Sequence, residues 1–94
     1  MKVGKYTARM IDFLSEFADG EMSRYDFEMD YSGYVIEHFP MMGREDSILA
    51  RIFADTVDST YEYAEGHHID DDDFRIMIVY AICDLLGIDE PDLF

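Results

Sequence analysis

The chain has 94 residues with 22 acidic and 7 basic side chains, which gives a formal net charge of −15 at pH 7. Because 49% of its residues are hydrophobic and 15% are aromatic, the composition excludes a disordered acidic tail and predicts a single globular domain over residues 1–94. The charge also argues against direct contact with nucleic acid or with an anionic membrane, since both attract Lys and Arg.

The sequence lacks the features of exported and membrane-spanning chains. Its longest apolar run, residues 76–83, is far shorter than the roughly 20 residues that a membrane helix needs. The N-terminal residues hold no apolar stretch followed by a small-residue cleavage site, as a secretory signal would. Cys83 is the only cysteine, so no intrachain disulfide can form. We therefore expect a complete cytoplasmic protein that does not bind membranes.

The first predicted helix covers about residues 6–18. Apolar side chains recur there at helical spacing, and Gly20 follows as a C-terminal stop. The next stretch is ambiguous, because polar and apolar side chains alternate over residues 24–31 as they do in a strand. The rest of the chain offers no partner strand, and a lone strand is not stable.

The ambiguous stretch is therefore predicted to be helical in two pieces. We expect a short helix near residues 23–29 and a second helical segment at about 31–39, which Pro40 ends. A loop over residues 41–45 follows. The pattern leaves open whether residues 21–40 include a strand.

The second half of the chain predicts two longer helices. One covers about residues 47–65, with Asp46 or Ser47 as its N-cap and Gly66 as its stop. The other covers about residues 71–86, begins in a run of aspartates that suit a helix N-terminus, and is apolar almost all round. A helix that is apolar all round is buried, so we expect this one to lie in the middle.

These elements predict an all-α fold: a compact single-domain bundle of about four helices with a central, apolar C-terminal helix. Beyond that helix, residues 89–92 are expected to add one turn, with Leu93 and Phe94 packing back onto the bundle.

Two groups of acidic residues raise the question of a metal ion. Consecutive helical side chains point about 100° apart, so four neighbouring aspartates cannot converge on one ion, and a solvated helix cap is favoured. The sequence leaves open whether a cation binds to the side chains of this segment, which are His67, His68, Asp70, Asp71, Asp72 and Asp73. Four other acids fall at calcium-loop positions, although Tyr31 stands where that loop needs Gly: Asp26, Glu28, Asp30 and Glu37. We predict no metal and no cofactor.

The sequence offers no catalytic residues. Cys83 lies inside the apolar helix, where a thiol behaves as an inert hydrophobic group. His38 is better explained as a packed or surface histidine than as a general base. A Gly-rich phosphate loop and a nucleophile elbow are both missing from the sequence. We therefore expect a protein that is not an enzyme.

The surplus of negative charge is the main functional signal. Residues 1–18 carry a local charge of +1, and residues 19–94 carry −16, so the acidity belongs to the body of the domain. A net charge of about 2–8 suffices to keep a small domain soluble. The excess suggests imitation of a polyanion, in which Asp and Glu on rigid helices occupy the basic surface of a nucleic-acid-binding protein.

The residues expected to contact such a partner are acids on predicted helix faces and caps, together with neighbouring tyrosines that could anchor the contact. They are Asp26, Glu28, Asp30, Asp55, Asp58, Glu62, Glu65, Asp70, Asp71, Asp72, Asp73, Tyr25, Tyr61 and Tyr63.

In size, charge and helix content the whole chain resembles two groups of proteins from bacteria and their mobile elements. One comprises the DNA-mimic inhibitors of phages and plasmids, such as anti-restriction and anti-CRISPR proteins. The other comprises the small helical immunity proteins that neutralise nuclease toxins such as colicins. The segments that resemble such proteins, through their mixture of acidic with aromatic or aliphatic residues, are YDFEMDY at residues 25–31 and ADTVD at residues 54–58.

The first resemblance implies an inhibitor that binds a nuclease, a restriction complex or a CRISPR complex. The second implies an immunity or antitoxin protein for one basic toxin. A third interpretation is a structural or assembly module whose charge serves only solubility. In the first two interpretations the partner is a basic protein, and the chain acts as a monomer or homodimer. Neither group contributes a specific site residue.

Overall fold

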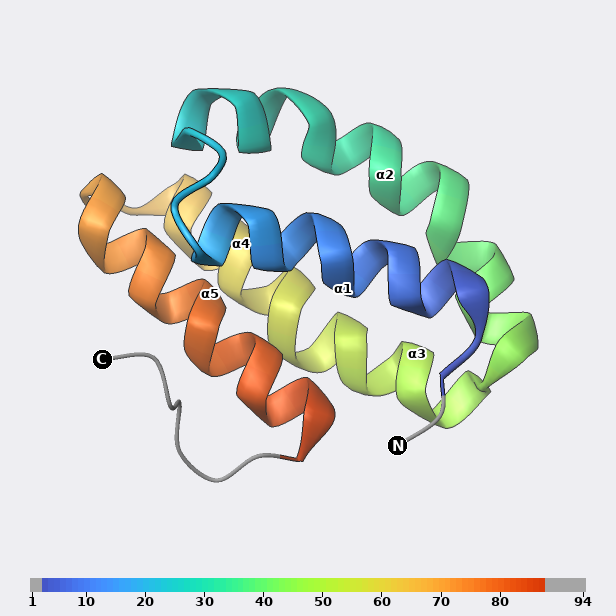
Figure 1. Ribbon diagram of the computed structural model, residues 1–94. Helices are drawn as coiled ribbons and strands as arrows, with labels where there is room; N and C mark the ends of the chain where they lie inside the picture. The colour runs from blue at the N-terminus through green and yellow to red at the C-terminus, as the bar shows by residue number, and fades with distance from the viewer. Residues whose placement is uncertain (1–2, 88–94) are drawn as a thin grey trace.

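The computed structural model describes residues 3–87 and contains four helical rods joined by short turns (Figure 1). The first two are α1, Lys5–Ala18, and α2, Arg24–Glu45. The third rod runs through α3, Ser47–Phe53, the π-helix η1, Ala54–Asp58, and α4, Ser59–Gly66. The fourth is α5, Asp71–Leu86. The predicted all-α bundle is confirmed, and the turn expected at residues 89–92 lies outside the described residues.

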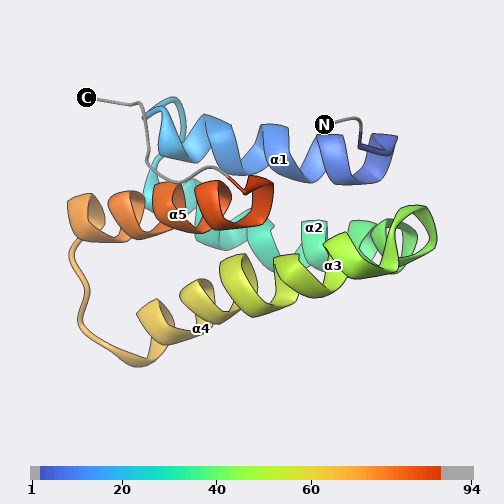
Figure 2. The ribbon, with the colours of Figure 1, turned by 90° about the horizontal axis from the view of Figure 1, so that it is seen from below.

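The rods pack in layers around α5. Figure 2 shows α5 between α1 on one side and the third rod on the other, which agrees with its contacts to α1, α3, η1 and α4. The C-terminal helix is therefore central, as predicted, although Ile76 and Tyr80 on its outer side are exposed. Helix α2 packs against α1 and α3 and forms the upper edge of the bundle in Figure 1.

Helix α2 differs most from the prediction. The prediction of two short helical segments followed by a loop at residues 41–45 was wrong, because one continuous helix runs through Pro40 to Glu45. Proline removes one helical hydrogen bond, at a cost of about 3 kcal/mol. Tertiary packing offsets this loss, since Met42 in the last turns of α2 is fully buried and the Glu45 side chain bonds to α1.

The alternating pattern at the start of α2 also has a helical explanation. Phe27 and Tyr31, four residues apart, are buried, whereas Tyr25 and Met29 are exposed on the other side. Two apolar sets at helical spacing on opposite sides produce the same alternation as a strand.

The third rod has the predicted bounds and a local widening. Asp46 caps it by accepting hydrogen bonds from the backbone N–H groups of Ile48 and Leu49, both at 3.0 Å. Within the wide turn the Thr56 hydroxyl donates to the Ile52 carbonyl at 2.7 Å, and the Ser59 hydroxyl donates to the Ala54 carbonyl at 3.2 Å. Such π turns inside α-helices often occur at functional positions.

The core is dominated by stacked aromatic rings. Centroid distances are 4.3 Å for Phe17–Phe27, 4.1 Å for Phe13–Tyr34 and 3.9 Å for Tyr31–Tyr61. The core also contains the two groups considered above for catalysis. Cys83 is buried, and His38 is buried with its Nδ1 at 2.9 Å from the Tyr34 carbonyl. Within residues 3–87, no helix is long and apolar enough to cross a membrane.

Candidate functional site

Four helix ends meet at one end of the bundle: the C-terminal ends of α1 and α4 and the N-terminal ends of α2 and α5. Two arginines hold them together. Arg24 of α2 donates to Asp71 at the start of α5, and Arg75 of α5 donates to the carbonyl of Phe17 at the end of α1. Residues far apart in the sequence therefore share one surface.

This surface, which we name the acidic pole, carries eleven carboxylates on the four helix ends and their connecting turns. They are Glu16, Asp19, Glu21, Asp26, Glu28, Asp30, Glu65, Asp70, Asp71, Asp72 and Asp73. Arg24 and Arg75 are the two cations among them, which leaves a surplus of nine negative charges.

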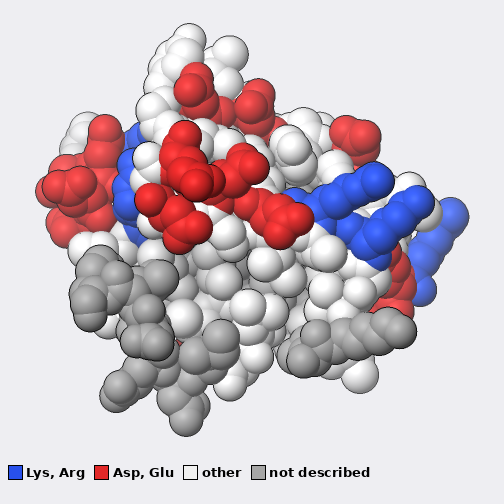
Figure 3. Space-filling view, in the orientation of Figure 1, with Lys and Arg blue, Asp and Glu red and all other residues white. Residues whose placement is uncertain are grey.

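The other cations lie elsewhere. Among the described residues, the remaining Lys and Arg are Lys5 and Arg9 near the start of α1, Arg44 at the end of α2 and Arg51 in α3. In Figure 3 red side chains gather over the end of α1 and the starts of α2 and α5, and blue side chains gather over the beginning of α1. The surface charge is therefore polarised along the bundle.

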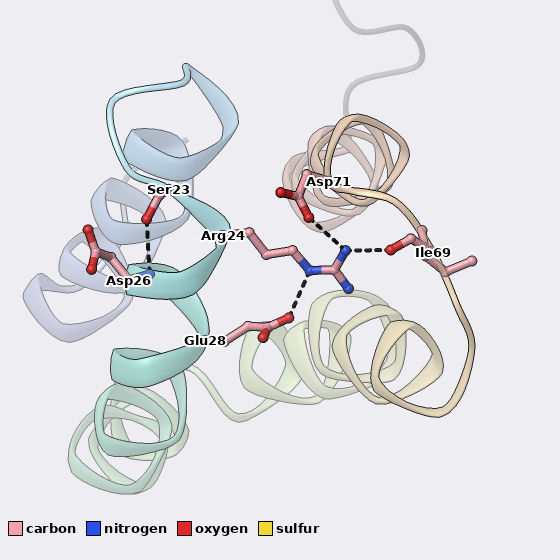
Figure 4. A network of polar contacts seen from close by, with 6 residues as sticks. All are labelled: Ser23, Arg24, Asp26, Glu28, Ile69 and Asp71. Atoms are coloured by element: carbon pink, nitrogen blue, oxygen red, sulfur yellow. Dashed lines mark hydrogen bonds and ion pairs between the residues drawn. The ribbon is translucent and has the colours of Figure 1, made fainter.

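Arg24 is directed into the structure rather than toward solvent. Its Nε donates to Glu28 Oε1 at 2.8 Å, and its Nη1 donates to Asp71 Oδ1 at 3.1 Å and to the Ile69 carbonyl (Figure 4). The guanidinium lies 4.6 Å from the centre of the Phe74 ring, and the side chain is 16% exposed. Burial acts to lower the pKa of Arg24, but the hydrogen bonds and charges of Glu28 and Asp71 raise it above its ordinary value.

Arg75 is held in a similar way. Its Nη1 donates to the carbonyls of Phe17 and Met22, and its guanidinium carbon lies 4.4 Å from the centre of the Phe17 ring. Arg75 thus links the end of α1 and the α1–α2 turn to α5, and Arg24 links the start of α2 to the start of α5. Their positive charges face inward, and most of the carboxylates around them face solvent.

Helix caps position the carboxylates of the pole. The Ser23 hydroxyl accepts a hydrogen bond from the Asp26 N–H at 3.1 Å, and Asp70 accepts one from the Asp73 N–H at 2.8 Å. The predicted capping by the aspartate run is therefore confirmed. The positive ends of the α2 and α5 dipoles lie beneath these acids and interact favourably with their negative charges.

The structure brings together part of the predicted contact set and separates the rest. The pole contains nine of these residues: Tyr25, Asp26, Glu28, Asp30, Glu65 and, at the start of α5, Asp70 with Asp71, Asp72 and Asp73. Asp55 lies apart, in a shallow depression that it lines together with Tyr63 and Asp84. Glu62 is exposed midway along α4.

Asp58 is engaged inside the bundle. Its Oδ1 accepts a hydrogen bond from the Tyr31 hydroxyl at 2.8 Å, and Tyr31 is only 2% exposed. Burial, and then the hydrogen bond to Asp58, raise the pKa of Tyr31 far above its usual value. The contact joins η1 to α2, so this carboxylate is a structural acceptor in the free protein.

The three predicted tyrosines fall into two kinds. Tyr25 and Tyr63 are exposed, and the Tyr63 ring stacks on His67 at 3.9 Å between centroids. Tyr61 is partly buried against Tyr31, and burial together with a hydrogen bond to Glu65 raises the pKa of Tyr61 to about 12. Tyr61 therefore supports the packing of α4 on α2.

The possible metal ligands do not converge. Within residues 3–87, no three His, Cys, Asp or Glu side chains are grouped closely enough to hold a metal ion. The four acids that matched a calcium loop by spacing all lie on α2, where a helix replaces the loop: Asp26, Glu28, Asp30 and Glu37.

Sequence reasoning missed an exposed apolar row on α2. Tyr25, Met29 and Ile36 lie on the solvent side of this helix. Their spacing of four and seven residues was visible in the sequence, but only a single helix through residues 24–45 places them on one side. Because the prediction divided the segment near residue 30, it assigned these three residues to two different helices and did not show that they are aligned.

No protein-family model, curated protein or solved structure matches the chain. Fold and surface together define a small all-α protein with a polarised surface charge.

Proposed function

We propose that the chain is a non-enzymatic inhibitor that binds the phosphate-binding surface of a basic, nucleic-acid-binding enzyme. The observation that carries this proposal is the acidic pole, where eleven carboxylates gather around two arginines that are directed inward. Acids arranged in this way gain from pairing with Lys and Arg and from fast, steered association, as nucleic acid does.

The rigidity of the pole supports the same function. Its carboxylates stand on helix ends fixed by caps and by the Arg24 and Arg75 contacts. A surface ordered before binding loses less conformational entropy when it meets its partner. A charge that served only solubility would need neither this clustering nor the inward-facing cations.

The dimensions favour a compact target. The longest extent of the protein is 34 Å, which is about one turn of B-form DNA. The pole, at one end of the bundle, can therefore replace the phosphates of less than one turn. A nuclease active site has this scale, which favours a second, related candidate: an immunity protein that neutralises one basic nuclease toxin.

The test begins with the partner. The immobilised protein is incubated with host lysate, bound proteins are eluted with a salt gradient, and the captured nuclease is purified. We expect it to lose activity when the chain is added and to regain it with excess duplex DNA or RNA. A toxin encoded by a neighbouring gene would favour the immunity function over a defence inhibitor.

The carboxylates are tested with two matched variants. The pole variant E16Q/D72N/D73N and the control variant D12N/D55N/D84N each remove three exposed acids. Exposed ion pairs contribute about 0.2–1 kcal/mol each, so the pole variant is expected to bind about tenfold more weakly, with a shallower salt dependence. The control should bind like the wild type. Equal affinities for all three proteins, or binding that is indifferent to salt, would overturn the proposal.

A further inference from the structure

The outer side of α2 carries an apolar stripe. Tyr25, Met29 and Ile36 are 71%, 65% and 76% exposed and recur at intervals of four and seven residues, so they lie along one side of the helix. Seven large hydrophobic side chains are exposed among the described residues, and three of them form this stripe. Scattered apolar residues are normal on a surface, but an aligned set marks a contact surface.

The stripe faces away from the rest of the bundle. Helix α2 packs through Phe27, Tyr31, His38 and Met42, which lie on its buried side. Helix α2 packs mainly against α1 and α3 and forms an edge of the molecule (Figure 1). Within the described residues nothing covers the stripe.

An acidic row runs beside the stripe. Asp26, Asp30 and Glu37 each follow one stripe residue in sequence, so they lie along the same flank of α2. All three are exposed, and within residues 3–87 none forms an ion pair. On the other flank Glu28 is already paired with Arg24. The face is thus apolar along its middle and negative along one edge.

The centre of this face is built from small residues. Ser32 and Gly33 are exposed there, and a Cβ added at Gly33 would contact nothing within 4 Å. Glycine in a helix interior is destabilising relative to alanine, and packing within this protein does not require it. A second helix that crosses α2 at this point would require a small residue here, because small residues allow two helix backbones to approach closely.

A second copy of the chain fits this face poorly. In an antiparallel pair centred on the stripe, Asp26 of one copy would lie near Glu37 of the other, and the two Asp30 side chains would meet. In a parallel pair the acidic rows would lie on opposite flanks and would gain no cation. A basic partner gains ion pairs along the row in addition to apolar contact.

We infer that the outer face of α2, from Tyr25 to Glu37, binds an amphipathic helix of the target whose apolar stripe is bordered on one side by Lys or Arg. The inference rests on the proposed function for the presence of a basic target. Tyr25, Asp26 and Asp30 belong to both surfaces, so one partner can engage the pole and the face together. The pole then supplies general attraction to basic surfaces, and the face selects one target.

The probe is a labelled synthetic peptide of about 20 residues, long enough to match most of α2. It carries leucines at helical spacing with arginines along one flank, and a control peptide carries glutamates at the same positions. Binding is followed by fluorescence anisotropy at moderate salt and mapped by amide chemical-shift changes. We expect the arginine peptide alone to bind and the changes to centre on residues 25–37.

Variants separate this face from the pole. M29Q/I36Q is expected to weaken peptide binding at least about tenfold with unchanged salt dependence, whereas I48Q/Y80Q, which removes two exposed apolar residues elsewhere, should bind like the wild type. G33L should raise the thermal midpoint of the free protein and still weaken binding, because the larger side chain blocks the close crossing.

Three results would overturn the inference: shift changes confined to the acidic pole, wild-type affinity of both M29Q/I36Q and G33L, or a dimer in sedimentation that M29Q/I36Q dissociates. Failure of the proposed function would look different. In that case the chain inhibits no nuclease, although the arginine peptide still binds to α2. If the inference alone fails, the nuclease is inhibited equally by wild type and M29Q/I36Q.

Discussion

The Glu45 carboxylate at the end of α2 caps the first turn of α1 through Thr7. Its Oε1 accepts hydrogen bonds from the Thr7 N–H at 3.0 Å and from the Thr7 hydroxyl at 2.9 Å, and its Oε2 accepts one from the Tyr6 N–H at 2.8 Å. The N-cap residue of α1, Gly4, has no side chain to perform this task. The cap is therefore supplied from 38 residues away in the sequence.

Removal of this carboxylate should destabilise the fold in a pH-dependent way. Partial desolvation acts to raise the pKa of the Glu45 carboxyl, but the hydrogen bonds from Tyr6 and Thr7 and the charge of Lys5 lower it below its usual value. A lowered folded-state pKa adds stability above the unfolded pKa, and this stability is lost as the pH falls through the folded pKa. We expect E45Q to unfold at lower urea than wild type at neutral pH, and the difference to shrink in acid.

Gly4 provides a control for this assignment. A Cβ at this position would collide with the Glu45 carboxylate, so G4A should also be destabilising in the presence of Glu45. The double variant G4A/E45A should then be less destabilised than the sum of the single changes, because the collision disappears with the carboxylate. Strictly additive losses of unfolding free energy would contradict the cap.

The contact between Tyr31 and Asp58 predicts a second loss of stability. Y31F removes the hydroxyl and leaves the Asp58 carboxylate without its donor in a partly buried position. The expected loss in unfolding free energy is about 1–2 kcal/mol, measured by urea denaturation. Y25F, at an exposed position on the same helix, is the matched control and should change stability by less than about 0.5 kcal/mol.

The same tyrosines predict how stability changes in alkali. Burial raises the pKa of Tyr31 well above its ordinary value and the pKa of Tyr61 to about 12. Raised folded-state values contribute stability that is fully present below about pH 10 and is lost as the pH rises. We expect the absorbance of tyrosinate to show a late phase that coincides with unfolding. A late phase in Y31F that is smaller by one tyrosine, with Tyr61 still titrating late, would confirm the assignment, and titration of all seven tyrosines near pH 10 would contradict it.

Local signals explain which parts of the fold were predictable. The end of α1 and the bounds of the third rod and α5 follow from caps and stops such as Gly20, Asp46, Asp70 and Gly87, which act within a few residues of their own position. The continuity of α2 through Pro40 depends on burial against other helices. The widened turn at residues 54–58 leaves the apolar periodicity nearly unchanged, so the sequence pattern could not predict it.

In the candidate site, too, some features were predictable from the sequence and others depend on tertiary contacts. The surplus of acids was countable from the sequence, but the acidic pole depends on which helix ends meet. The pattern could not tell that Asp58 turns inward to Tyr31 or that Arg24 and Arg75 withdraw their charges into the structure. Composition thus predicts the sign of the partner's charge, and tertiary contacts determine which carboxylates remain free to contact the partner.

Arg24 should be important for stability because it holds the pole together. R24Q would leave Glu28 and Asp71 without a cation and would remove the contact with Phe74. We expect a loss of about 1–2 kcal/mol in unfolding free energy, measured by urea denaturation, since removing one partner of a partly buried pair leaves charge uncompensated. Added salt should restore part of this loss, because it screens the repulsion among the remaining carboxylates.

The matched control for R24Q is R51Q. Arg51 is exposed on α3, away from the pole, and within residues 3–87 it forms no salt bridge. Both variants make the net charge more negative by one, so a difference between them reports position rather than total charge. R51Q should change stability by less than about 0.5 kcal/mol. Equal losses in R24Q and R51Q would mean that net repulsion alone limits stability and that the Arg24 contacts contribute nothing specific to the acidic pole.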